Sequence, residues 1–285
     1  MDFLIWFNEL MRFLKQFLFG IFFLAVFGGI GFWIYKTATY HEPTCFDKIQ
    51  NQGEQAVDCG PVCGNVCLSL LKPIEARDSY LFKIKEEAGG AADYDALFMV
   101  TNPNARFGVA AVNYELSILD GQGAALLKKE GQFYILPGQT KYIYEPAVKT
   151  RSTAVRAELK IATPDWQELT GIFGEDASFV AKSKDYIVND RPGVFSRVSG
   201  VLFNASDFDF DRVDIVAVLF KNGQPIGAGR TDARTFPSQS NRFFEVTWVN
   251  SLETPDRVEV EANTNIFQNS NFLRKYGTPE KFQEH

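Results

Sequence analysis

The chain has few residues of the kinds that carry out catalysis. Of its 285 residues only two are histidines, His41 and His285, and neither is placed with a serine or cysteine nucleophile inside a predicted folded unit. The sequence also contains no G-x-S-x-G, P-loop or H-E-x-x-H motif. These absences argue against Ser/His/Asp and Cys/His catalysis. We therefore expect a protein that is not an enzyme and has no catalytic residues.

Clustered positive charge is also missing. The chain has 29 lysines and arginines against 35 aspartates and glutamates, a formal net charge of −6. No basic stripe with interleaved aromatic residues occurs along it. Because binding to a phosphate backbone requires clustered lysine and arginine, nucleic acid is not an expected partner.

One long apolar run dominates the N-terminal region. Residues 16–35, between Lys15 and Lys36, are all uncharged and nearly all apolar. A helix rises about 1.5 Å per residue, so this run spans roughly 30 Å, the hydrocarbon thickness of a bilayer. It is longer than the apolar core of about 7–15 residues in a signal peptide, and a poor cleavage site follows it. The run predicts a retained transmembrane helix over residues 16–36, with the lipid bilayer as its partner.

The residues around this run predict how the helix is placed. Residues 1–15 have polar side chains on one helical side and aromatic or aliphatic ones on the rest, which is typical of a helix lying among lipid headgroups. Ala25 and Gly29 form a small-xxx-small pair that would let two such helices approach closely. Homo-oligomerisation through the transmembrane helix is therefore one expected interaction, besides contacts with other envelope proteins.

All cysteines of the chain fall in a short segment after the apolar run. An even number of clustered cysteines is typical of disulfides in an oxidising compartment. The segment 37–72 is therefore predicted to be a disulfide-tied stalk outside the cell membrane, with the N-terminus cytoplasmic. Three pairings are open, and a zinc site is disfavoured because the first cysteine stands alone. The four residues are Cys45, Cys59, Cys63 and Cys67.

The cysteine segment resembles the C-x-D-x-I-x-N-x-x-E-x-x-V-D-C-G-G-x-C motif found in many bacterial surface proteins. It departs from that motif at Pro61, where a second glycine is usual, and in the spacing of the last cysteines. Its polar residues could offer oxygen ligands to calcium, although their spacing is not that of an EF-hand. No other cofactor is expected. The candidate ligands are Asp47, Asn51, Glu54 and Asp58.

Two segments about a hundred residues apart repeat one pattern. Asn102 precedes Gly121 by nineteen positions, and Asn204 precedes Gly223 by nineteen. A proline, a glutamine and a glutamate then recur at matched offsets. This agreement predicts an internal duplication. The matched residues are Pro137, Gln139 and Glu145 in the first copy and Pro237, Gln239 and Glu245 in the second.

Each copy has the pattern of β-strands joined by tight turns. Apolar and polar residues alternate with period 2, and Asp120-Gly121 and Asn222-Gly223 are hairpin turn dipeptides. A hundred residues of short strands indicate an immunoglobulin-like sandwich. The predicted fold is mainly β: one transmembrane helix, then sandwiches at 73–163 and 178–267.

Two shorter segments complete the predicted organisation. The linker 164–177 follows Thr163, which is predicted to cap a short helix with Pro164 at its first position. Within it, Trp166 is expected to pack against one sandwich. The C-terminal residues 268–285 are polar with scattered aromatics, and they predict a loose tail.

The repeated pattern resembles the FxLYD family and the related late embryogenesis abundant type-2 sandwiches. The second copy carries this resemblance over roughly residues 178–265, with Leu219-Phe220 where the family has Leu-Tyr. The first copy is more distant. The resemblance implies an extracytoplasmic β-sandwich used for adhesion, spacing or assembly, without enzymatic activity.

Two smaller features have structural interpretations. Four aspartates between residues 207 and 214 alternate with Phe208 and Phe210, which is more typical of a solvated strand edge than of a glycosidase or calcium site. Asn102 and Asn204 recur at equivalent places, as expected for side chains that cap turns.

These features together predict a non-enzymatic structural or protein-binding subunit of a cell-envelope assembly, such as a pilus or secretion system. The alternative is a surface receptor for a solute or carbohydrate. That alternative requires a concave aromatic pocket, for which Trp166 and Trp248 are the tryptophans outside the membrane.

Overall fold

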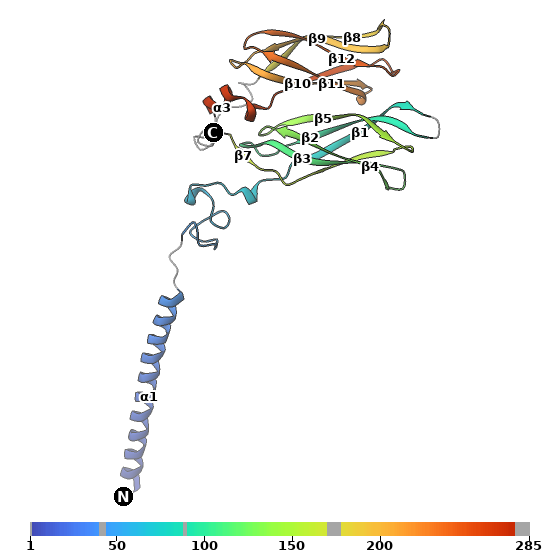
Figure 1. The fold of residues 1–285 in the computed structure, drawn as a ribbon. Helices are drawn as coiled ribbons and strands as arrows, with labels where there is room; N and C mark the ends of the chain where they lie inside the picture. The colour runs from blue at the N-terminus through green and yellow to red at the C-terminus, as the bar shows by residue number, and fades with distance from the viewer. Residues whose placement is uncertain (1, 40–43, 88–89, 170–177, 277–285) are drawn as a thin grey trace. The chain divides into compact units, whose positions relative to one another are not determined.

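The computed structural model describes residues 2–39, 44–87, 90–169 and 178–276. The chain divides into two compact units, Met1–Leu70 and Leu71–His285. The first unit contains a long N-terminal helix, and the second is built from antiparallel β-sheets, so the fold is mainly β (Figure 1).

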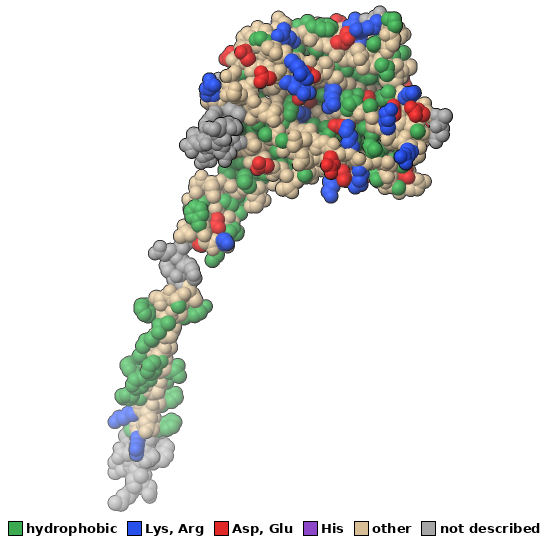
Figure 2. All heavy atoms as spheres, in the orientation of Figure 1, with side chains coloured by type: hydrophobic (Ala, Val, Ile, Leu, Met, Phe, Trp, Pro, Cys, Tyr) green, Lys and Arg blue, Asp and Glu red, His purple; other side chains and the backbone are tan. Residues whose placement is uncertain are grey.

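The first unit begins with one continuous helix, α1 (Asp2–Thr39). From Met11 to Thr39 this helix is long and apolar enough to cross a membrane, and that stretch is not buried by protein. Hydrophobic side chains cover much of its described surface (Figure 2). Side chains 1–10 lie outside the described residues, so the amphipathic face predicted for residues 1–15 stays a prediction.

The rest of the first unit, residues 44–70, is called the cysteine module here. It contains two short 3₁₀ turns, η1 (Pro61–Cys63) and η2 (Leu68–Leu70), and two isolated β-bridges. Such a short segment cannot bury an apolar core of its own, so cross-links and local hydrogen bonds must hold it together.

The second unit begins with a three-stranded and a four-stranded sheet that pack face to face as a first sandwich, the fourth strand being the short β7 (Gln167–Glu168) that pairs with β3. One sheet has the order β1-β2-β5 and the other the order β4-β3-β6. A shared apolar core lies between them. The strands are β1 (Glu75–Glu86), β2 (Ala92–Thr101), β3 (Phe107–Leu119), β4 (Ala125–Ile135), β5 (Thr140–Thr150) and β6 (Arg156–Ile161).

A second sandwich follows with the same strand order. Its sheets are β8-β9-β12 and β11-β10-β13, so β8 to β13 correspond in turn to β1 to β6. A separate apolar core fills it. The strands are β8 (Phe179–Arg191), β9 (Val194–Asn204), β10 (Phe210–Lys221), β11 (Gln224–Phe236), β12 (Asn241–Trp248) and β13 (Arg257–Asn263).

The predicted period-2 alternation is present in the central strands of both sandwiches. On β3 the side chains that enter the core are Val112, Tyr114, Leu116 and Ile118. On β10 they are Val213, Ile215, Ala217 and Leu219. The side chains between them face outward, as strand geometry requires.

The two copies differ in register by one residue at the penultimate strand. Tyr144 pairs with Leu97, whereas Glu245 pairs with Ser199, and Leu97 and Ser199 lie equally far before Asn102 and Asn204. Glu245 therefore takes the place of Tyr144, and the predicted equivalence with Glu145 is wrong. The turn before β12 is one residue longer, since the amide of Asn102 donates to Gln139 O but that of Asn204 donates to Ser240 O.

The helix predicted to start after Thr163 is absent from the described part of the linker, which is extended. Strand β7 (Gln167–Glu168) pairs with the start of β3, and the Leu169 amide donates to Arg106 O at 2.9 Å. Trp166 packs against the first core, as predicted, while Leu169 is buried in the second. An extended segment can reach both cores while pairing its backbone with a strand. Residues 170–177 lie outside the described residues.

The predicted loose tail is also wrong as far as residue 276. A 3₁₀ turn, η3 (Ile266–Gln268), leads into the helix α3 (Ser270–Tyr276). Ile266 and Phe272 are buried in the second core, where the Phe272 ring lies 5.1 Å from that of Phe208. These apolar side chains hold the segment on the sandwich. Residues 277–285 lie outside the described residues.

Candidate functional site

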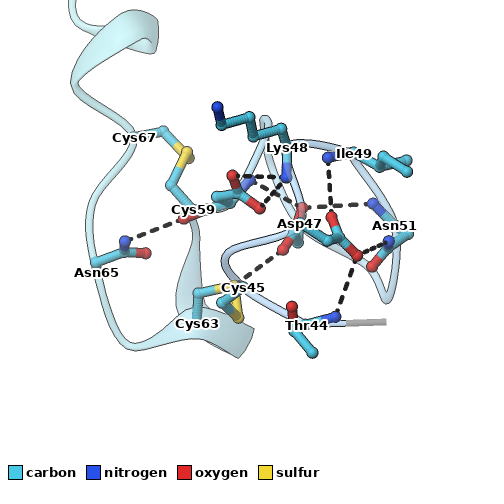
Figure 3. Close-up of a disulfide and its surroundings, with 12 residues drawn as sticks. Thr44, Cys45, Asp47, Lys48, Ile49, Asn51, Cys59, Cys63, Asn65 and Cys67 are labelled. Atoms are coloured by element: carbon cyan, nitrogen blue, oxygen red, sulfur yellow. Dashed lines mark hydrogen bonds between the residues drawn. A yellow bond between two sulfur atoms is a disulfide. The ribbon is translucent and has the colours of Figure 1, made fainter. Parts of the chain in front are cut away.

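The four cysteines form two disulfides within the cysteine module. Cys45 is bonded to Cys63 and Cys59 to Cys67, so one of the three open pairings is selected (Figure 3). The two bonds interleave along the chain and close loops of a segment that has little regular structure.

The acidic residues of the module bind its own backbone. Asp47 accepts hydrogen bonds from the amides of Thr44 (3.2 Å) and Ile49 (2.8 Å) (Figure 3). Asp58 accepts from the amide of Lys48 (3.0 and 3.1 Å). Buried Glu54 accepts from the amide of Asp58 at 3.1 Å. These bonds replace the secondary structure that the segment lacks.

The structure therefore brings the proposed calcium ligands into one module but engages them locally. The side-chain amide of Asn51 donates to Asp47 at 2.8 Å, and the carboxylates of Asp47, Glu54 and Asp58 accept backbone N–H groups. Calcium would have to compete with these donors. Its binding stays a prediction.

The closest set of metal-ligand types in the module does not fit a metal. Sulfur and carboxylate atoms of Cys45, Glu54 and Cys63 lie within 4.8 Å of one another. Both sulfurs belong to one disulfide, however, and a disulfide has no thiolate to bind zinc. The Cys63 sulfur likewise has no proton to donate to Glu54.

The two sandwiches of the second unit share an apolar contact surface. The outer face of the β1-β2-β5 sheet packs on the outer face of the β11-β10-β13 sheet (Figure 1). Leu97 and Val218 are fully buried there. The contact joins both sandwiches into one body. The buried apolar residues of this interface are Leu97, Tyr144, Val218, Phe220 and Ala228.

Polar contacts extend the interface beyond its apolar centre. The backbone amide of Tyr142 donates to Glu261 at 3.1 Å, and the Tyr142 hydroxyl donates to Glu259 at 3.1 Å. The side chain of Gln139 donates to Asn263 at 2.7 Å. Each of these bonds joins one sandwich to the other, and together they fix how the two sandwiches are placed on each other.

A polar cleft of about 660 Å³ opens beside the apolar contact, between β4 and β5 of one sandwich and β10, β11 and β13 of the other. Lys141 lines it although only 6% exposed; its ammonium group lies 3.3 Å from Tyr134 O and 3.6 Å from the Tyr134 ring centroid. Burial lowers the pKa of Lys141 and raises the pKa of Glu261 on the facing strand. Keeping either side chain charged therefore costs free energy, because both are largely removed from water.

The carboxylates lining the cleft are mostly engaged. Glu145 binds the hydroxyl of Tyr114 and the ammonium group of Lys129, and Asp214 accepts from Arg212 at 2.8 Å. Asp232 accepts from Arg234 and Glu261 from Asn263. The fifth, Asp211, is exposed. Most carboxylates of the cleft are therefore hydrogen-bonded or ion-paired. Among the described residues, no two unpaired carboxylates face each other across it.

The other residues singled out in the sequence have structural roles. Asp207, Asp209 and Asp211 are exposed while Phe208 and Phe210 are buried, which confirms the solvated edge for these three aspartates; the fourth, Asp214, is half-buried at the cleft. Asn102 and Asn204 are fully buried, and their side-chain oxygens accept from the amides two residues later, at 3.0 and 3.1 Å. The predicted turn capping is therefore confirmed.

The interface was not predicted from the sequence, although β10 carries a signal for it. From Ile215 to Phe220 every residue of this strand is apolar, so neither face is polar. A continuous apolar strand is typical of burial on both sides. Lys141 carried no such signal, because its burial depends on the neighbouring sandwich.

Comparison with models of known protein families gives no match, and no curated protein matches the chain.

Proposed function

We propose that the protein is a membrane-anchored, non-enzymatic subunit of an extracytoplasmic cell-envelope assembly, with a structural or protein-binding role in, for example, a pilus or a secretion system. The observation that carries this proposal is the order of the parts along the chain. An apolar helix leads through a disulfide-bonded module into two sandwiches that pack as one body.

The disulfides and the helix support the proposed placement. Disulfides persist outside the cytosol, so the cysteine module and everything after it belong outside the membrane, with the N-terminus cytoplasmic. The small residues Ala25 and Gly29 of α1 offer a surface for association with a second copy.

The identical strand order supports an origin by duplication of an immunoglobulin-like, FxLYD-like module. Sandwiches of this kind present sheet edges and outer faces to partners. One such face of the second sandwich is uncovered among the described residues, where Phe243 of β12 is 65% exposed. We propose this face, with its neighbours Val201 and Val180, as the place where another envelope protein is bound.

Crosslinking in native membranes tests the proposal. A photoreactive residue at Phe243 should crosslink to a discrete envelope protein, whereas one at Lys128, on the polar face of the first sandwich, should not. The variant Phe243→Glu should abolish specific co-purification of that protein, with Lys128→Glu as the matched control. Equal recovery with both variants would contradict a role for this face. Cytoplasmic labelling of residues after α1 would contradict the proposed orientation.

A solute receptor is the second candidate, and the cleft favours it. The side-chain oxygen of Asn265 is buried at the cleft with no hydrogen-bond partner, and buried Lys141 has donors to spare. Neither Trp166 nor Trp248 lines the cleft. A thermal-shift screen should then find a solute whose stabilisation is saturable and is lost in Lys141→Met. No saturable hit in a broad sugar and solute set would remove this candidate.

A further inference from the structure

We propose that the cysteine module is itself a lipid-binding element, which lays exposed apolar side chains into the outer surface of the bilayer next to the helix. This inference rests on the membrane anchor of the proposed function and adds a second contact with lipid. Its partner is a neutral or zwitterionic membrane surface.

The exposed apolar side chains of the described chain are distributed unevenly. Residues 44–70 expose many in a short stretch, whereas the far longer segment 71–276 exposes few among its described residues. In the module they are Phe46, Ile49, Val57, Val62, Val66, Leu68 and Leu70; in the second unit they are Val155, Val180, Val188, Phe243 and Val249. Phe46 is 89% exposed, more than any other large hydrophobic side chain among the described residues.

Such exposure is unusual for a segment surrounded by water. An apolar surface of this density on a protein exposed to solvent marks a site of contact with protein or membrane. The module can keep these side chains outside because disulfides and internal hydrogen bonds, rather than an apolar core, hold it together.

The charged side chains of the module do not oppose contact with lipid, because its carboxylates are hydrogen-bonded within the module. The carboxylates of Asp47, Glu54 and Asp58 accept amide N–H groups of the module itself. Lys48 is its single basic residue. Attraction to lipid would therefore come from apolar burial, and unlike a polybasic segment it should not weaken as salt rises.

The covalent connection keeps the module near the membrane. Thr44, its first residue, follows the end of α1 at Thr39 by five residues. Five residues span at most roughly 16–18 Å even when fully extended. The headgroup region adds about 5–8 Å on each side of the hydrocarbon. The module therefore starts within reach of the bilayer surface, and this proximity identifies lipid as the occupant of its apolar surface.

Depth-dependent quenching in the full chain tests the inference. The protein has no free cysteine among its described residues, so single cysteines can be added and labelled with a polarity-sensitive fluorophore, after peptide mapping shows both native disulfides intact. The protein is placed in phosphatidylcholine nanodiscs with quenchers at headgroup depth or deep in the acyl chains. The labelled variants are Phe46→Cys and Leu68→Cys in the module, Leu24→Cys in α1, and Lys128→Cys on the first sandwich.

The expected quenching pattern distinguishes lipid contact by the cysteine module from membrane anchoring by α1. Labels at residues 46 and 68 should lose at least half of their emission to headgroup quenchers, equally at low and high salt. The label at residue 24 should respond to deep quenchers and that at residue 128 to neither. Residues 46 and 68 behaving like residue 128, while residue 24 is quenched, would overturn the lipid contact alone. Lack of quenching at residue 24 would overturn the anchor as well.

A protein partner on the same surface gives a different result. If a second copy covered the module, labels at residues 46 and 68 would be shielded from water without being quenched by lipid, and the shielding would vanish at one protein per nanodisc. That outcome would overturn the proposal. The double variant Phe46→Ser/Leu68→Ser should make a label at Ile49 at least twofold less sensitive to headgroup quenchers, whereas Val155→Ser should leave it unchanged.

Discussion

The two sandwiches share one strand order but use the outer face of the same sheet differently. On β3 the outward residues include Asn113, Glu115 and Ser117, and Glu115 forms a surface ion pair with Lys128 at 2.8 Å. On β10 the corresponding face carries Val216, Val218 and Phe220, which are packed against the first sandwich. A few outward side chains thus decide whether this sheet faces water or another sandwich.

The other sheet of each sandwich shows the reverse: its outer face is covered in the first sandwich and exposed in the second. The outer face of β1-β2-β5 is covered by the second sandwich, while on β8-β9-β12 the outward Phe243 is 65% exposed. Unlike faces meet at the interface, and each sandwich keeps one face that has no equivalent contact in the second unit. The contact is therefore of the heterologous kind.

A charge at the centre of the interface should have the largest effect. Val218→Asp places a carboxylate where the side chain is fully buried, and an uncompensated buried charge costs roughly 3–5 kcal/mol. Ser117→Asp, at the matching outward position of β3 opposite Lys128, should cost less than about 0.5 kcal/mol. Calorimetry of the full chain in detergent should show two separated transitions for the first variant and one for the second. Equal behaviour would contradict the contrast between the faces.

Removal of the buried asparagines should cost the two sandwiches similar amounts. Asn102 donates to Phe107 O and Leu136 O, and Asn204 donates to Phe208 O and Pro237 O. Each change to alanine leaves buried carbonyl groups unpaired, which costs roughly 1–3 kcal/mol. Hydrogen exchange should show the loss in the sandwich that carries the change. A neutral effect in one copy would show that its turn does not depend on the asparagine.

Tyr142 and Phe243 allow a matched test of the covered and the free face. Tyr142 pairs with Met99 and Phe243 with Val201. These partners lie three positions before Asn102 and Asn204, respectively. Tyr142→Ser removes a partly buried ring and a bond to Glu259, and should cost about 1–2 kcal/mol. Phe243→Ser should change stability by less than about 0.5 kcal/mol. Chemical denaturation followed by circular dichroism measures both; comparable losses would mean that the second face is covered too.

The interface should make stability depend on pH. Burial raises the pKa of Glu261 above its ordinary value of 4.5, so the folded state holds a proton that the unfolded state releases. Stability should fall as the pH rises from about 4.5 through the raised pKa, by at most about 1.4 kcal/mol per pH unit. Lys141 and Asp214 are the charged groups nearby. Glu261→Gln should flatten this slope, and Glu115→Gln on the free face should not.

Features that depend on local pattern could be predicted from the sequence. The uninterrupted apolar run predicts α1, and alternation on β3 and β10 predicts the core-facing residues. The repeated asparagines predict the turns that they cap. In each case the feature depends on residues that are close in the sequence or that recur with the period of a single strand or helix.

Features that depend on distant segments could not be predicted. Thr163-Pro164 has the signature of a helix start, but pairing of β7 with β3 satisfies the backbone instead. The repeated proline and glutamine before β12 suggested one register, and a longer turn imposed another. Three further features depend on which distant segments pack together: the disulfide pairing, the burial of Lys141 and the packing of Phe272 in the second core.

The outer wall of the first sandwich is polar where the matching wall of the second sandwich is apolar. If a module with these two faces were copied again, each new unit could stack on the last, because a head-to-tail contact forms an open array unless its rotation closes a ring. Glu115 and its partner Lys128 place a charged surface where a further unit would have to dock. A further sandwich that stacked in the same way would meet either this charged surface or the face that carries Phe243.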